Sequence, residues 1–167
     1  MPAELDLSRL LAALNRHQVS YVLIGGLAAV YHGSPFPTED LDITPATGAD
    51  NLQRLSAALL DLKARIRTES VPEGLPFAHD AASLAAASTW NLSTEAGDLD
   101  ISFKPDGTTG YGDLVRDAES ADLYGSVVRV ASLADVIRSK QAANRPKDQR
   151  VLPTLRRILS ERGRKPD

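Results

Sequence analysis

The sequence predicts an α/β (α+β) protein in which helices flank a small mixed β-sheet and the C-terminal half is helical. Short β-rich runs, such as residues 19–24, stop at glycines or turns and are followed by apolar residues at helical spacing. With 167 residues, of which 43% are hydrophobic and 25% charged, the chain has the size and composition of a globular domain. We expect one domain over residues 1–167, with a sheet-containing catalytic core over about 1–110 and a mainly helical part over about 111–167.

In the first part of the chain, apolar periodicity and turn residues set the predicted elements. Ser8 can cap the first helix, and Gly25-Gly26 can stop the first strand at a tight turn. Residues 68–80 contain Pro, Gly and Ser and predict a loop, with a short strand at its start. The predicted elements are a helix from about 8 to 18, a strand at 19–24, a helix at 27–32, a rigid loop at 33–37, a strand at 41–44, a helix from 47 or 48 to 64, and a hairpin of strands 88–92 and 99–103.

The second part carries clearer signals for helix ends. Ser132 with Asp135 three positions later forms a variant of the capping box, and Pro146 suits the first turn of a final helix. Pro153 lies inside that helix and predicts a kink. The predicted elements are a short helix at 111–117, a strand at 126–130, and helices at 133–144 and 146–161.

Charge is unevenly distributed along the chain. The formal net charge is −3, yet the segment from 138 to 165 contains Arg138, Lys140, Arg145, Lys147, Arg150, Arg156, Arg157, Arg162, Arg164 and Lys165. A basic region on an acidic protein suggests an anionic partner, either nucleic acid or nucleotide phosphates. For residues 162–165, a solvated helix end without a partner is the alternative.

Composition also excludes some classes of protein. Because the chain has no cysteine, it has no disulfide framework, no thiolate zinc site and no cysteine nucleophile. The first residues lack the basic and apolar regions of a signal peptide, and no apolar segment reaches membrane-spanning length. We therefore expect a cytoplasmic protein with no membrane association.

The most informative motif is Asp40-Leu41-Asp42, which follows Gly25-Gly26 after thirteen residues. On a strand, residues two apart point to the same face, so the two carboxylates project together while Leu41 enters the core. Such a pair needs a cationic neighbour, and hard divalent cations prefer carboxylate oxygens. Two acidic residues on a solvated strand face are common, but Asp100 offers a third carboxylate. The motif therefore indicates a metal platform for phosphate chemistry.

These motifs resemble the signature of the nucleotidyltransferase superfamily, in which a glycine pair is followed by Asp-x-Asp and a later third carboxylate. More closely, three segments are similar to the AbiEii/MenT-type nucleotidyltransferase toxins of bacterial toxin-antitoxin systems: 23–29 with the glycine pair, 38–43 with the two aspartates, and 140–148 with Lys-x₄-Arg-x-Lys-Asp. The resemblance covers about residues 20–155. It implies the minimal, DNA polymerase β-like nucleotidyltransferase fold, with the Asp-bearing strands side by side.

The resemblance also implies a role for each motif. Asp40 and Asp42 would hold Mg²⁺ or Mn²⁺, and Asp100 would complete a second metal position or accept the proton of the attacking hydroxyl. Gly25 and Gly26 would let the backbone approach a triphosphate closely. Further nucleotide contacts would come from Ser34, Lys140, Arg145 and Lys147, with Lys140 as the leading catalytic cation.

Some of these residues have plain structural alternatives. Ser34 can be an ordinary turn residue, and Lys140 can be merely exposed. Asp98 shares a strand face with Asp100 and can be solvated. For Asp148, bracing Arg145 or a helix N-terminus is the better interpretation.

The predicted function is transfer of NMP from an NTP to an RNA acceptor, with release of pyrophosphate. The resemblance suggests the 3′ end of tRNA as acceptor, a resulting block of translation, and a cognate antitoxin as partner of a monomeric chain. The alternatives are transfer to a small molecule such as an aminoglycoside, transfer to a protein hydroxyl, and a catalytically silent antitoxin or binding module. Relatives often carry arginine where this chain has Phe36, which bears on substrate choice. Ser34 and Thr38 are hypothetical sites of phosphorylation by an antitoxin.

Overall fold

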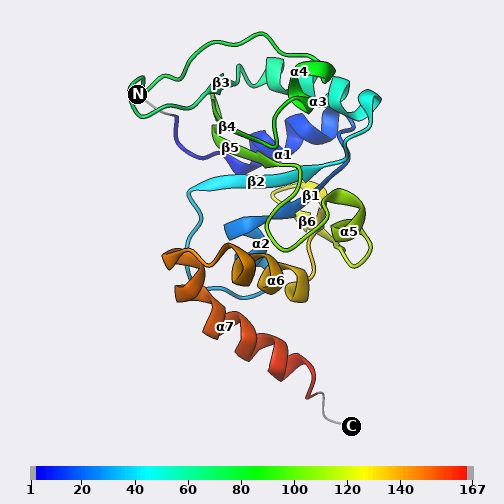
Figure 1. Cartoon of the computed structure of the whole chain (residues 1–167), viewed down its shortest axis with the longest axis vertical. Helices are drawn as coiled ribbons and strands as arrows, with labels where there is room; N and C mark the ends of the chain where they lie inside the picture. Colours follow the sequence, from blue (N-terminus) through cyan, green and yellow to red (C-terminus); the bar gives the residue numbers. More distant parts are fainter. Residues whose placement is uncertain (1–2, 165–167) are drawn as a thin grey trace.

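Seven strands form one mixed sheet with helices on both faces, in a computed structural model that describes residues 3–164 (Figure 1). The helices are α1 (Leu7–Arg16), α2 (Gly25–Tyr31), α3 (Ala49–Asp61), α4 (Ala81–Ala85), α5 (Tyr111–Val115), α6 (Leu133–Ala143) and α7 (Pro146–Arg162). The strands are β1 (Tyr21–Ile24), β2 (Asp40–Pro45), β3 (Arg65–Ile66), β4 (Thr89–Thr94), β5 (Gly97–Ser102), β6 (Glu119–Leu123) and β7 (Ser126–Val130). The predicted fold class is confirmed.

The strand order places the two Asp-bearing strands next to each other near the middle of the sheet. The order is β3-β4-β5-β2-β1-β7-β6. Strand β2 runs antiparallel to β1 and parallel to β5, and the register pairs Asp40 with Asp98 and Asp42 with Asp100. Because paired residues point to the same face, these carboxylates meet on one side of the sheet.

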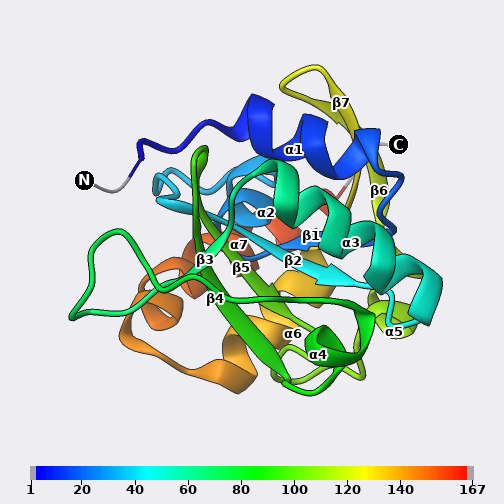
Figure 2. The same ribbon diagram turned by 90° about the horizontal axis from the view of Figure 1, so that it is seen from above.

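The opposite face of the sheet carries a large part of the hydrophobic core, which also extends to α2, α6 and α7. Helices α1 and α3 cover this face, as seen from above in Figure 2, and their leucines pack against apolar residues of the central strands. Leu41 and Ile43 alternate with the aspartates along β2 and are fully buried. Helices α2, α5 and α6 lie on the carboxylate side, and α7 extends from that side away from the body (Figure 1).

Helix ends follow local chemistry, with one correction to the prediction. Helix α1 is capped by the side chain of Asp6, which accepts a hydrogen bond from the Arg9 N–H at 3.1 Å, and not by Ser8, which lies inside the helix. Ser132 caps α6 as predicted, through the Asp135 N–H at 3.1 Å. Pro146 occupies the first turn of α7, which continues as one helix through Pro153.

The sequence analysis did not predict two elements, strand β6 and helix α4, because the sequence pattern of each is weak. Strand β6 has the sequence Glu-Ser-Ala-Asp-Leu, which lacks a β-branched residue because the strand lies at the sheet edge. Helix α4 has only five residues, and its N-cap is Asp80. Strand β6 forms a hairpin with β7, which is the strand predicted at 126–130. Within the part of the chain that the structure describes, no helix is long and apolar enough to cross a membrane.

Candidate functional site

A large cleft lies between the carboxylate face of the sheet and the helices α2, α6 and α7. Its volume is about 790 Å³. The glycine turn, the aspartates of β2 and β5, and the basic residues near the start of α7 all line it. The cleft therefore brings together the three segments that carry the sequence motifs.

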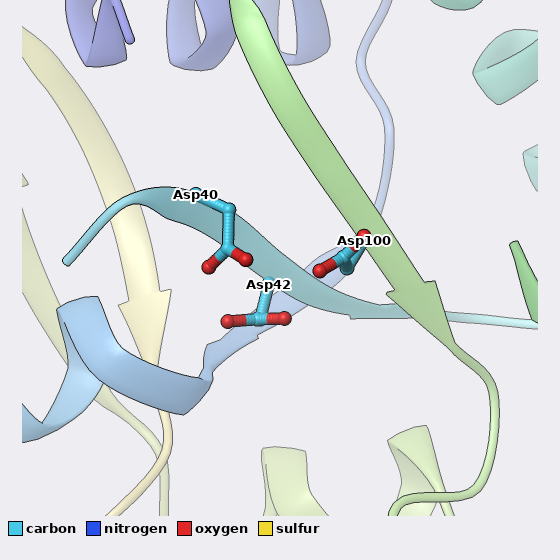
Figure 3. A group of neighbouring side chains, drawn as sticks. All are labelled: Asp40, Asp42 and Asp100. Atoms are coloured by element: carbon cyan, nitrogen blue, oxygen red, sulfur yellow. The ribbon is translucent and has the colours of Figure 1, made fainter. Parts of the chain in front are cut away.

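Asp40, Asp42 and Asp100 converge on one point of this cleft. Each offers a carboxylate oxygen, and these three oxygens lie within 4.8 Å of one another. Figure 3 shows the three side chains pointing toward a common space from two adjacent strands. The parallel pairing of β2 and β5 places the two Asp-bearing strands side by side, as the family resemblance implied.

The mutual repulsion of these carboxylates favours the binding of a cation. Burial, reinforced by the charges of Asp40 and Asp100, raises the pKa of Asp42 from 3.8 to about 7. Burial likewise raises the pKa of Asp100 to about 6, although Arg67 opposes the shift. Three carboxylates that repel one another, at ligand spacing and with an open side toward the cleft, fit the oxygen-ligand preference of Mg²⁺ or Mn²⁺. We therefore identify them as the candidate metal ligands.

The glycine pair is required for the approach of the β1–α2 turn to Asp42. Gly25 has φ +70°, and a Cβ there would overlap the Asp42 carboxylate. A Cβ at Gly26 would stand 3.0 Å from Thr38 Oγ1, and that hydroxyl donates to the Asp40 carbonyl at 2.8 Å. The pair thus packs directly on the carboxylate strand, which fits the turn interpretation. Its contact with phosphates stays a prediction.

Ser34 lies in the loop between α2 and β2 and lines the cleft. Its Oγ accepts a hydrogen bond from the Phe36 N–H at 3.2 Å, which is the role of an ordinary turn residue. Phe36 is partly exposed and also lines the cleft. The loop therefore presents an apolar ring to the cleft at this position.

The basic residues at the joint of α6 and α7 are organised by Asp148. This carboxylate is fully buried and accepts hydrogen bonds from the Arg145 backbone N–H at 3.1 Å and from Arg145 Nε at 2.8 Å. Lys140 Nζ lies 3.6 Å from Asp148 Oδ1, and the Lys140 side chain is only 12% exposed. Burial lowers the pKa of Lys140, although Asp148 opposes this. The structure confirms that Asp148 braces Arg145, and Lys140, Arg145 and Lys147 all line the cleft.

Sequence reasoning missed Arg67, which directly contacts the aspartate cluster. Its Nη2 lies 2.5 Å from Asp100 Oδ1, and its Nη1 lies 3.3 Å from Asp98 Oδ2. Asp98 is thus paired and not merely solvated. Arg67 directly precedes the predicted loop over 68–80 and lies 33 positions before Asp100, so only the pairing of β3 with β4 and of β4 with β5 shows where it points.

Comparison with known proteins identifies the fold. No family model and no curated protein matches the chain. Among solved structures, the lincosamide antibiotic adenylyltransferase LnuA, with lincomycin bound, is similar at a TM-score of 0.59 and 18% identity, over 93% of this chain and 99% of that one. The antibiotic-resistance factor ANT(2″)-Ia is similar at a TM-score of 0.52 and 16% identity, over 92% of this chain and 89% of that one. A proposed nucleotidyltransferase from Thermotoga maritima is similar at a TM-score of 0.52 and 17% identity, over 93% of this chain and 91% of that one. The chain has the nucleotidyltransferase fold.

Proposed function

We propose that this protein is a metal-dependent nucleotidyltransferase that transfers NMP from an NTP to an acceptor hydroxyl and releases pyrophosphate. The observation that carries the proposal is the convergence of Asp40, Asp42 and Asp100 beside the glycine turn, inside a cleft lined by basic residues. A divalent cation held by these carboxylates would supply charge neutralisation on the transferring phosphoryl group.

The residues of the cleft divide the remaining work. Lys140, Arg145 and Lys147 bind the triphosphate and stabilise the departing pyrophosphate. Gly25 and Gly26 admit the phosphates next to the β1–α2 turn, where Ser34 adds a hydroxyl contact. Asp100, at the β4 side of the cluster, accepts the proton of the acceptor hydroxyl as that oxygen forms a bond to the α-phosphorus and the α–β bridging bond breaks.

For the acceptor, we infer RNA, with the 3′ end of tRNA as the expected site. Three exposed cations lie on one face of α7 at spacings of three and seven residues, which we call the basic stripe: Lys147, Arg150 and Arg157. Lys147 and Arg150 line the cleft, so the stripe begins at the site and follows the projecting helix outward for about 15 Å. A phosphate backbone is a partner that matches such an extended series of charges. In this proposal the protein is a monomeric cytoplasmic toxin, neutralised by an antitoxin.

A small-molecule acceptor is the second candidate, and the comparisons favour it. Both LnuA and ANT(2″)-Ia are described as acting in antibiotic modification or resistance, and both share this fold over most of the chain. At identities of 16 to 18%, the similarity shows a shared fold and does not determine which acceptor this protein uses.

One labelling experiment tests both candidates. The protein is incubated with Mg²⁺ and each α-labelled NTP, together with total tRNA, an aminoglycoside, a lincosamide or protein alone. We expect label in tRNA with the wild type and none with Asp42→Asn, while Asp61→Asn, which removes an exposed carboxylate on α3 far from the cleft, behaves as wild type. Label in an antibiotic or in protein would replace RNA as acceptor. Label in no acceptor, or equal label with Asp42→Asn, would contradict the proposed activity.

A further inference from the structure

Arg67 is held beside the aspartate cluster by contacts that give its guanidinium a defined place. It follows β3, and its backbone N–H donates to the Asn91 carbonyl at 2.9 Å. Its Nη1 donates to the Leu92 carbonyl at 3.1 Å. Both acceptors lie on β4, and the Arg67 side chain is 29% exposed. The guanidinium therefore reaches across β4 toward β5 from two fixed points.

The contacts on β5 pair this guanidinium with two carboxylates at once. Asp98 and Asp100 lie two residues apart on one strand face, so one planar fork can meet both, at 3.3 and 2.5 Å. Because Asp98 pairs with Asp40 in the register, and Asp100 with Asp42, the four carboxylates form two parallel columns on the sheet. Arg67 pairs with both carboxylates of the β5 column, and among residues 3–164 no cation forms an ion pair with the β2 column.

Other cations of the cleft do not share this task. Lys140 and Arg145 both pair with Asp148 on the opposite wall. Within residues 3–164, Arg67 is the one cation that forms an ion pair with any of the four carboxylates. Four carboxyl groups thus face one guanidinium, which stays charged near neutral pH.

We propose that Arg67 is the resident counter-ion of the Asp98–Asp100 column and that it restricts the nucleotide-free protein to one tight divalent cation site. This inference rests on the proposed metal-dependent function of the same cluster. The site comprises Asp40, Asp42 and the Asp100 oxygen that Arg67 does not bind. A second cation at Asp100 would have to displace the guanidinium from the Asp98–Asp100 pair, so Arg67 competes with it directly. Two-cation chemistry at this site then requires Arg67 to yield its contact with Asp100.

Titration with Mn²⁺ alone, read by electron paramagnetic resonance of the free ion, tests the proposal without an activity assay. The variants are Arg67→Gln, which removes the charge, and Arg67→Lys, which keeps it. Arg9→Gln is the matched control, because it removes the same charge from an ion pair with Glu95 at 2.8 Å, away from the cleft. We expect one Mn²⁺ per chain for wild type, Arg67→Lys and Arg9→Gln. For Arg67→Gln we expect a second Mn²⁺ per chain, or an affinity for the first that is about tenfold tighter.

The outcomes separate this proposal from the proposed function. Unchanged or weaker Mn²⁺ binding by folded Arg67→Gln, checked by circular dichroism, would overturn the counter-ion role, as would a second Mn²⁺ in Arg67→Lys. If neither wild type nor Arg67→Gln binds Mn²⁺, the counter-ion role and the metal requirement both fail. A second Mn²⁺ in Arg67→Gln supports the counter-ion role even where the labelling experiment finds no acceptor.

Arg67→Gln combined with Asp100→Asn is expected to return to one Mn²⁺, and a second ion there would contradict the assignment to Asp100. If Arg67→Gln does not fold, Arg67→Met takes its place, with the same expected result.

Discussion

At the scale of single residues, Asp42 combines burial with two like charges. Both effects favour its protonated form, and Lys147 is a weaker opposing charge. Asp42 occupies this position because the φ of +70° at Gly25 lets the β1–α2 turn come down on the carboxylate. The ionised Asp42 carboxylate therefore destabilises the folded protein when no metal is bound. A bound cation would remove this cost by neutralising the carboxylate.

The pH dependence of stability follows from this environment. In the folded, metal-free protein the pKa of Asp42 is about 7, against an ordinary value of 3.8, so the folded state binds more protons than the unfolded state between these values. Its contribution to stability is present below about pH 4 and is lost as pH rises through about 7, by an amount on the order of 4 kcal/mol. Mg²⁺ binds the ionised form and acts in the opposite direction.

Thermal unfolding measures this effect. We expect Mg²⁺ to raise the Tm of wild type more at pH 8 than at pH 5, and Asp42→Asn to show no Mg²⁺ effect. In the absence of metal, Asp42→Asn should gain stability relative to wild type as pH rises. An equal Mg²⁺ effect at both pH values would contradict the raised pKa of Asp42.

At the scale of elements, the β1–α2 turn positions the site and depends on glycine. Gly25→Ala places a methyl group on Asp42 at a positive φ, so we expect a loss of stability of about 2 kcal/mol or more and loss of transfer activity. The matched control is Gly112→Ala in α5, where an added Cβ meets nothing within 4 Å. Urea unfolding compares the two variants. If the urea midpoint of Gly25→Ala equals that of wild type, the turn accommodates the methyl group without loss of stability and the prediction is contradicted.

The joint between α6 and α7 depends on a different buried group. Asp148→Ala removes the acceptor of Arg145 and the partner of Lys140, so we expect a loss of about 2 to 4 kcal/mol in unfolding free energy. Asp61→Ala is the exposed counterpart, and breaking its contacts with Arg16 and His17 should cost much less than the loss at Asp148. Chemical denaturation of both variants checks the difference, and equal losses would mean that Asp148 does not organise the joint.

At the scale of the whole molecule, α7 connects the cleft to an extended charged surface. Its far end is anchored by Arg162, whose Nη1 lies 3.2 Å from His32 Nδ1 on the C-cap of α2. Arg162 is thus occupied in holding the helix, while the basic stripe faces solvent. The distinction matters because only exposed cations on one face can follow a polyanion.

Salt dependence of RNA binding tests the stripe. We expect Arg150→Gln combined with Arg157→Gln to weaken tRNA binding and to reduce the slope of log K against log salt by about 0.7 for each phosphate that the variant no longer neutralises. Arg9→Gln combined with Arg16→Gln, which removes the same charge from α1, is the control. Filter binding at several salt concentrations separates them. An equal change in both double variants would assign the effect to net charge instead of the stripe.

The sequence alone determined the elements that depend on local patterns. The glycine turn, the alternating Asp-x-Asp strands and the Ser132 cap are short-range signals, so neighbouring residues predict the class of fold and the pair Asp40 and Asp42. The choice of Asp100 over Asp98 as the third ligand came from the family resemblance. The weakly apolar β6 and the five-residue α4 lacked such signals. Ser8 was predicted as the cap that Asp6 forms in the structure, since serine and aspartate both suit an N-cap.

Only the tertiary structure decided which charges meet. Parallel pairing of β2 with β5 brings Asp42 beside Asp100, and antiparallel pairing of β3 with β4 places Arg67 next to Asp100. Likewise, the turn between α6 and α7 buries Asp148 against Lys140 and Arg145. These contacts join residues that are up to 58 positions apart in the Asp42–Asp100 case. Strand register and helix packing fix them, and no local spacing encodes them.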